Sequence, residues 1–364
     1  MMRPVDPRIE RYARLLVERA VAPPAGSQVM VVANVPARPL VEEVAGLLAR
    51  RGCYALVRLE YGDWRLPTSL AWARGAPEEL LREMAPIERR AAEEADARIV
   101  VHAPDNTRES ASLGAHRYSL VQEGLEPYLR RARTLEIPWV GCQYPTPALA
   151  QDAGMSLREF EDFLYGACLL DWDEERRKME RIAERFDRAE EVRIEGDGTD
   201  LTLGLAGREA AIDDGHLNLP GGEVYAGPVE DSAEGVISFS EFPAVYGSNE
   251  VTGVRLRFES GRVVDASAAT GEEFLLGTLD VDEGARGLGE LGIGCNPGIT
   301  RHMKNVLFDE KIYGTVHLAL GASYPFTGGT NVSSVHWDIV KDLRRGGRLS
   351  CDGEVVQENG AWLF

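Results

Sequence analysis

The hydrophobic pattern of the chain changes in kind near residue 188, and this change limits the folds open to it. Before that point, short apolar runs such as 28–33 and 97–101 alternate with segments of helical periodicity such as 39–51. Strands that alternate with helices form parallel β-α-β units. We therefore expect residues 1–188 to form an α/β, Rossmann-like N-terminal domain with a parallel sheet.

After residue 188 the chain becomes a series of short strands separated by turns that contain glycine or proline. The strand-like runs are 200–205, 236–239, 251–258, 262–268, 312–320 and 333–339, with a helical segment at 271–279. This pattern predicts a β-rich α+β domain over residues 189–364. Two domains also suit a length of 364 residues, because a single hydrophobic core rarely extends over so long a chain.

Composition and charge argue against several classes of partner. The chain has 40 Lys and Arg against 59 Asp and Glu, a formal net charge of −19, which would not attract nucleic acid or an anionic membrane surface. No apolar run approaches the ~20 residues of a membrane-spanning helix. The five cysteines are far apart and odd in number, and the N-terminus lacks an apolar signal segment, so we expect a reduced cytoplasmic protein.

Nucleotide binding is not supported by the first half of the chain. The turn after the strand at 28–33 has the sequence Ala-Asn-Val-Pro-Ala-Arg, without the glycine-rich cradle that holds a phosphate. A Walker lysine loop is absent as well. We therefore expect no bound dinucleotide.

Two predicted strands of the second half carry side chains that bind metals. In 335–339, apolar Val, Trp and Ile alternate with His336 and Asp338, which therefore project from one face of a strand, about 6.6 Å apart. His317 lies in the similarly apolar run 315–320. Imidazole and carboxylate groups are ligands for zinc and similar divalent ions. The two strands suggest a metal site built on a sheet.

Two glutamates lie in unusual surroundings in the same half. Glu223 follows a Gly-Gly pair and precedes strand formers, and Glu290 lies within the apolar, glycine-rich run 287–294. A carboxylate in such surroundings is costly to bury unless it is paired or bound to a cation. Two histidines and three carboxylates suit a pair of divalent ions that share a bridging carboxylate.

Each of these residues also has a structural explanation when it is taken alone. His317 could be a hydrogen-bonded core histidine, His336 and Asp338 an imidazole oriented by an acid, and Glu223 a turn residue or a helix cap. The chain also lacks a compact zinc signature such as His-Glu-x-x-His. Residue type and spacing therefore leave the metal site as one of two interpretations.

In four segments the sequence resembles the M29 family of metallo-aminopeptidases. The segments are 218–228, which contains Asn-Leu-Pro-Gly-Gly-Glu-Val-Tyr, then 289–292, then 317–325, with His-Leu-Ala-Leu-Gly-Ala-Ser-Tyr-Pro, and 336–338, with His-Trp-Asp. The resemblance places five residues at the metal-ligand positions of the family: Glu223, Glu290, His317, His336 and Asp338. It implies that Glu290 bridges the two ions, and that either Glu223 or Glu290 acts as the general base.

The resemblance also implies the remaining features of the site. Tyr324 falls on the position of an active-site tyrosine, whose phenol could donate a hydrogen bond to an oxyanion. Two divalent ions are implied, zinc or cobalt first and magnesium or manganese next. The expected protein is a homodimer whose active sites open into an enclosed cavity and remove N-terminal residues from short peptides.

One departure from the family and two hypotheses other than the aminopeptidase stay open at this point. The segment 325–335 is shorter than its counterpart in the family's characterised aminopeptidases, and it could alter the wall that selects an amino terminus. More distantly, the sequence resembles an iron(II) ring-opening dioxygenase that acts on dihydroxypyridine, for which His317, His336 and Asp338 alone would be sufficient ligands. A homologue that keeps the fold without catalysis is the third hypothesis.

Overall fold

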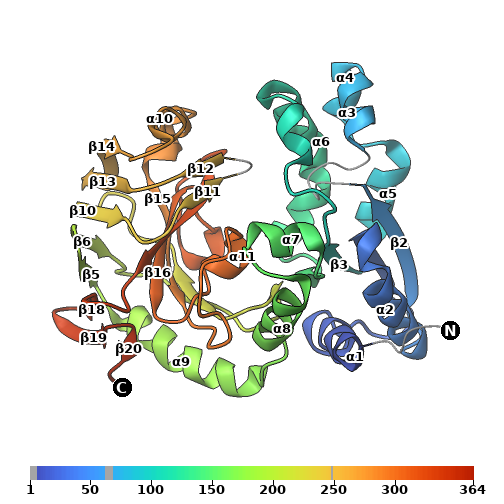
Figure 1. Cartoon of the computed structure of the whole chain (residues 1–364), viewed down its shortest axis with the longest axis horizontal. Helices are drawn as coiled ribbons and strands as arrows, with labels where there is room; N and C mark the ends of the chain where they lie inside the picture. Colours follow the sequence, from blue (N-terminus) through green and yellow to red (C-terminus); the bar gives the residue numbers. More distant parts are fainter. Residues whose placement is uncertain (1–5, 62–68, 247–248) are drawn as a thin grey trace. The chain divides into compact units, whose positions relative to one another are not determined.

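A computed structural model describes residues 6–61, 69–246 and 249–364 (Figure 1). The chain divides into two compact units. Unit 1 consists of Met1–Leu169 and Gly215–Pro220, and unit 2 of Leu170–Asp214 and Gly221–Phe364. The domain boundary predicted at residue 188 falls at the C-terminal end of helix α9 (Trp172–Arg188), and it stays a prediction.

Unit 1 contains a five-stranded parallel sheet, which confirms the predicted α/β class for the first half. Its strand order is β2-β1-β3-β4-β8, and every neighbouring pair is parallel. The strands are β1 (Gln28–Asn34), β2 (Tyr54–Glu60), β3 (Ala97–His102), β4 (Trp139–Gln143) and β8 (Asn218–Leu219). Strands β1 and β3 are almost entirely buried, as the apolar runs predicted. Parallel strands are buried in this way because the helices that connect them cover the faces of the sheet.

The described helices of unit 1 follow the predicted order, but several are shorter than the sequence pattern suggested. They are α1 (Pro7–Arg14, continued by a π-helical turn at Leu15–Ala20), α2 (Arg38–Arg50), α3 (Leu70–Gly75), α4 (Glu78–Leu81), α5 (Pro86–Glu94), α6 (Ala115–Arg133), α7 (Pro147–Asp152) and α8 (Leu157–Cys168). The sequence of 77–95 has a helical pattern throughout, but the structure divides it into α4 and α5, because Pro86 can begin a helix but cannot lie inside one. The charged helical stretch 157–190 is divided as well, into α8 and α9, since Asp171 caps the second helix.

Unit 2 is built from antiparallel sheets, as predicted for a β-rich α+β domain. An eight-stranded sheet has the order β14-β13-β10-β6-β5-β18-β19-β20, and a five-stranded sheet has the order β17-β16-β15-β9-β7. The strands of the larger sheet are β5 (Glu191–Gly196), β6 (Thr199–Gly204), β10 (Glu234–Phe239), β13 (Val254–Glu259), β14 (Arg262–Ser267), β18 (Arg348–Cys351), β19 (Glu354–Glu358) and β20 (Ala361–Trp362). Those of the smaller sheet are β7 (Ala211–Asp213), β9 (Glu223–Ala226), β15 (Leu288–Gly294), β16 (Thr315–Gly321) and β17 (His336–Asp342).

The remaining elements of unit 2 are short. Strands β11 (Ala244–Tyr246) and β12 (Asn249–Val251) form a separate pair, and the helices are α9, α10 (Glu272–Leu279) and α11 (Val306–Asp309). The strand predicted over 251–258 is interrupted between β12 and β13. No helix within the described residues is both long and apolar enough to cross a bilayer.

A single apolar core joins both sheets of unit 2 with α9. It contains Ile237 from the larger sheet, Leu318 and Trp337 from the smaller one, and Phe186 from α9. Every residue of β15 and β16 is buried, including those whose side chains point away from this core. The second face of the five-stranded sheet is therefore also shielded from water.

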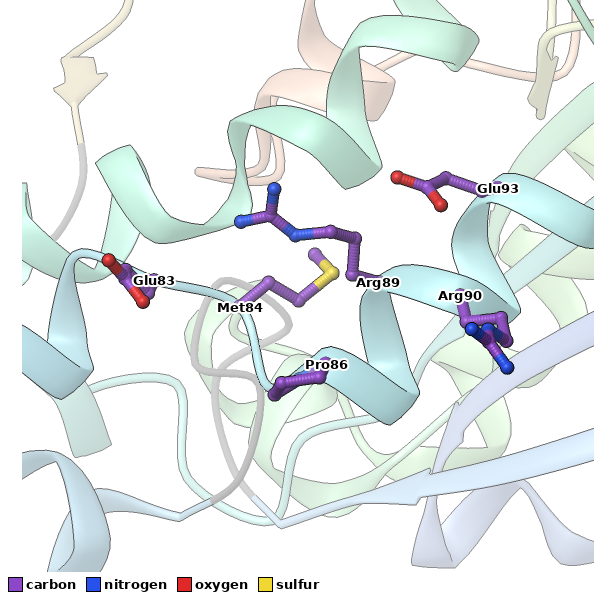
Figure 2. A pocket seen from close by; sticks show the side chains of 6 residues that line it. All are labelled: Glu83, Met84, Pro86, Arg89, Arg90 and Glu93. Atoms are coloured by element: carbon purple, nitrogen blue, oxygen red, sulfur yellow. The ribbon is translucent and has the colours of Figure 1, made fainter.

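Unit 1 has a surface depression of roughly 460 Å³ beside α5 (Figure 2). It is lined by Glu83, Met84, Pro86, Arg89, Arg90 and Glu93. All of these residues except Met84 are exposed, and their charges are of both signs. It contains none of the predicted site residues.

Candidate metal centre

Five ligand-type side chains project from one face of the five-stranded sheet. The strand register pairs His317 with Gly292, and it pairs Ala319 with both Glu290 and Asp338. Opposed residues of antiparallel strands point to the same face, as do residues two apart along a strand. By this rule the face carries Glu223 from β9, Glu290 from β15, His317 from β16, and His336 and Asp338 from β17. The register thus gathers all the predicted ligands on one surface.

Glycines allow close contacts on this face of the sheet. Gly292, Gly294 and Gly321 lie opposite His317, Glu223 and His336, respectively. A β-carbon added at Gly292 would lie 1.9 Å from Nε2 of His317, which is far too close for any side chain. Only glycine therefore lets the imidazole lie across β15.

The three most buried ligand-type residues form a tight group. His317 Nε2 donates a hydrogen bond to Glu290 Oε1 at 3.0 Å and lies 3.6 Å from Glu223 Oε2. One ligand atom of Glu223, one of Glu290 and one of His317 all lie within 4.8 Å of one another. A β-bulge between Leu288 and Glu290 precedes the glutamate on β15, and bulges of this kind re-aim side chains near functional sites.

His336 and Asp338 extend the group along β17. His336 Nε2 lies 3.6 Å from Asp338 Oδ2, and Nδ1 of the same ring is 2.8 Å from the carbonyl oxygen of Ala322. A carbonyl only accepts, so Nδ1 carries a proton, and Nε2 is the ring nitrogen that faces Asp338. A backbone carbonyl that orients a histidine in this way is the usual support for a metal ligand.

The pKa values of the site report a strongly negative environment. Burial raises the pKa of Glu290, although the hydrogen bond from His317 opposes that shift. Burial alone would lower the pKa of His317, but Glu290 and the other carboxylates outweigh it and raise the pKa to about 9. The pKa of His336 is raised against burial in the same way, mainly by Asp338. Without another cation, protons neutralise this cluster.

The donor set fits a divalent cation. Oδ1 of Asp338 is buried and has no hydrogen-bond partner among the described residues, and leaving such an oxygen unpaired is costly. Carboxylate oxygens and imidazole nitrogens are the donors that zinc and related ions take. The residues that could hold such ions are the five on the sheet face: Glu223, Glu290, His317, His336 and Asp338.

Sequence reasoning missed two charged residues that adjoin the centre. The side chain of Lys311 is 0% exposed, and its Nζ lies 3.0 Å from Glu223 Oε1 and 4.0 Å from Asp213 Oδ2. Lys311 also donates a hydrogen bond to Glu310, whose pKa burial raises to about 8 even though the ammonium opposes this shift. The ammonium therefore engages one oxygen of Glu223, while the other faces His317.

Tyr324 lies beside the ligand-bearing face. Its ring centroid is 5.2 Å from that of His336 and 6.0 Å from that of Tyr225. Burial, followed by the charge of Glu290, raises the pKa of Tyr324 well above its ordinary value. The phenol therefore keeps its proton at neutral pH and can act as a hydrogen-bond donor.

The fold and the site together define a class of protein, the metal-dependent enzymes whose ligands converge from several strands. The sequence matches the family described as Thermophilic metalloprotease (M29) over residues 5–362, and the chain belongs to this family. The resemblance stated from the sequence is thereby confirmed, as is the expectation of a metal-dependent hydrolase that acts on peptides.

Individual relatives agree with the family assignment. Aminopeptidase 2 of Geobacillus stearothermophilus is 28% identical, over 99% of this chain and 98% of that protein. The structure of wild-type AmpT from Thermus thermophilus superposes with a TM-score of 0.82 at 26% identity, over 98% of this chain and 99% of that one. The structure of a 2,5-dihydroxypyridine dioxygenase from Pseudomonas putida KT2440 superposes with a TM-score of 0.61, over 98% of this chain and 96% of that one. At 15% identity, this likeness shows a shared fold alone.

Proposed function

We propose that this chain is an aminopeptidase that removes N-terminal residues from short peptides with two divalent ions. The observation that carries the proposal is the convergence of Glu223, Glu290, His317, His336 and Asp338 on one buried sheet face in a member of the M29 family. Zinc or cobalt are the proposed ions, with magnesium or manganese next. When bound, such a pair of ions makes a shared water acidic and polarises a carbonyl group.

The side chains of the site have distinct roles in this proposal. Glu290 accepts a hydrogen bond from His317, and the charge of Asp338 helps to raise the pKa of Glu290, which suits a carboxylate shared by both ions. Glu223 and Glu290 are the two candidates for the base that takes a proton from the attacking water. Tyr324, protonated at neutral pH, would donate a hydrogen bond to the oxyanion that forms on the scissile carbonyl.

Lys311 restricts how Glu223 can act. Its ammonium lies 3.0 Å from Oε1 of Glu223, whereas Oε2 of the same carboxylate is the oxygen that faces His317. Glu223 is therefore placed to bind an ion through Oε2. Both glutamates stay candidates for the base.

We further propose that the enzyme is a cytoplasmic homodimer. Five free cysteines, all of them buried, suit a reducing compartment. The dimer is proposed from the family resemblance, with an enclosed cavity that admits only short peptides. Sedimentation or light scattering would test the oligomeric state directly.

Metal analysis and peptidase assays together test the proposed function. Protein purified without chelators would be analysed for bound metal and assayed on amino-acid p-nitroanilides with added Zn²⁺ or Co²⁺. The expected result is two ions per chain and metal-dependent release of p-nitroaniline. A correctly folded protein that turns over no substrate with any metal would overturn the proposal. A single iron with Fe²⁺-dependent oxygen uptake would favour the dioxygenase alternative.

A further inference from the structure

Three aromatic side chains form a cluster beside the candidate metal centre. The rings of Tyr324 and Phe326 are stacked, with centroids 5.4 Å apart, and Tyr225 meets both of them edge-on at 6.0 and 6.3 Å. Tyr225 is only 6% exposed, whereas Phe326 is 40% exposed. Phe326 is thus the ring of the cluster that offers a broad apolar surface to a ligand.

The sheet register places this cluster on the ligand-bearing face. Tyr225 follows Glu223 by two residues in β9, so both side chains point to the same face. The ring of Tyr324 meets the ring of His336 edge-on, with centroids 5.2 Å apart. Since Phe326 contacts both tyrosines, its exposed ring borders the space into which the ligands project.

The segment that carries Phe326 is firmly anchored. Thr327 Oγ1 accepts a hydrogen bond from the backbone N–H of Gly227 at 3.1 Å, and Thr330 donates from both its backbone N–H and its hydroxyl to Glu230 Oε1. A β-carbon added at Gly227 would lie 3.0 Å from Cα of Gly329, so the two backbones are in close contact. An anchored ring loses little conformational entropy when a ligand packs on it.

We propose that the exposed ring of Phe326 is the surface on which the side chain of the substrate's N-terminal residue packs, so that the enzyme selects large apolar N-terminal residues. This inference rests on the proposed aminopeptidase function. It assigns a role in substrate selection to the segment 325–335, which carries Phe326.

The N-terminal side chain is the one in reach of the ring. In the proposed reaction Tyr324 donates to the oxyanion of the attacked carbonyl, and Phe326 stacks on Tyr324. The side chain of the N-terminal residue is attached to the carbon next to that carbonyl, whereas the following side chain lies beyond the amide nitrogen. A ring stacked on Tyr324 is therefore nearest to the N-terminal side chain.

The test compares substrate selectivity among four proteins with the same metal loading. Wild type, F326A, F326L and V332A would be assayed on leucyl-, phenylalanyl- and glycyl-p-nitroanilide, and kcat/KM compared as ratios. Val332 is the matched control, since it lies in the same segment, is apolar and is 85% exposed, but belongs to no ring cluster. We expect F326A to lower the leucyl-to-glycyl ratio by roughly tenfold, because part of the apolar burial is lost. F326L should retain most of the ratio and V332A all of it.

The outcomes separate this inference from the proposed function. If the wild type hydrolyses peptides but F326A leaves the ratio unchanged, or lowers kcat/KM equally for all three substrates, the specificity role of Phe326 is wrong while the aminopeptidase stands. If, in a dipeptide series, selectivity follows the second residue, the assignment to the N-terminal side chain is wrong. If the wild type hydrolyses no substrate with any metal, the proposed function fails and this inference fails with it.

Discussion

Replacement of Lys311 by methionine should destabilise the metal-free protein far more than the metal-loaded protein. The ammonium of Lys311 lies 3.0 Å from Glu223 Oε1 and 4.0 Å from Asp213 Oδ2, and its side chain is entirely buried. At an effective dielectric constant of about 20, unit charges at these distances attract by about 5.5 and 4 kcal/mol, respectively. The cost of burying the ammonium offsets much of this, and removal of one partner from a buried ion pair typically costs about 3–5 kcal/mol.

The metal state changes the size of the expected loss. In the metal-free site, K311M leaves the carboxylates of Glu223, Asp213 and Glu310 without their cation, so the thermal midpoint should fall by roughly 10 °C. Divalent ions bound at the sheet face would supply positive charge to Glu223 and make the loss smaller. Calorimetry of chelator-treated and metal-saturated protein would measure both midpoints.

Lys341 provides a matched control for this experiment. Its side chain is 1% exposed and donates a hydrogen bond to Glu241 at 2.6 Å. The side chains of Lys341 and Asp338 project from opposite faces of β17. K341M should therefore lower the midpoint by the same amount with and without metal. If K311M behaved in that way too, or left the midpoint within about a degree of the wild type, Lys311 would not stabilise the carboxylates of the centre.

Three further outcomes follow from the geometry of the site. Gly292→Ala should displace the His317 ring and weaken metal binding by about 10–100-fold in a chelator competition, whereas Gly277→Ala, which has open space around it, should leave metal binding unchanged. Glu290→Gln should weaken metal binding by at least ~100-fold in the same competition, because it removes the charge shared by the cluster; binding within a few-fold of wild type would contradict that role. In the metal-free protein the pKa of His317 is raised from 6.5 to about 9, so its contribution to stability is complete below pH 6.5 and is lost as the pH rises through 9. The thermal midpoint should fall over that range, and a His317→Asn variant that falls just as steeply would refute this assignment.

The strands that carry the candidate site could be predicted because their periodicity is local. Apolar Trp337 and Ile339 point into the core of unit 2, and His336 and Asp338 point to the opposite face, as the alternation at 335–339 predicted. The parallel sheet of the first half and the β-rich character of the second half also followed from the pattern of runs and turns. The ends of the helices were less predictable, since Asp171 caps a new helix inside one continuous charged stretch.

The charges around the ligands could not be predicted in the same way. Glu310 and Lys311 are adjacent and opposite in sign, a pattern that usually indicates a solvated surface. They are enclosed because α11 brings them against Glu223 and Asp213, which are neighbours only through the pairing of β7 with β9. Burial of this kind depends on contacts between segments far apart in sequence, and no local pattern reports it.

One signal in the sequence was stronger than residue types alone suggested. On β15, Gly292 and Gly294 follow Glu290 at intervals of two, and on β16, Ala319 and Gly321 follow His317 in the same way. With a period of two, each ligand shares its face with the smallest residues, while Leu291, Ile293, Leu318 and Leu320 fill the core side. A strand that needed only to bury a histidine or a glutamate would gain stability from larger neighbours on that face. The glycines instead make room for neighbouring groups: the His317 imidazole lies where a side chain at Gly292 would be, and the backbone oxygen of Ile312 lies where a side chain at Gly294 would be. Close approach of this kind is what brings an imidazole and the carboxylates within reach of shared cations.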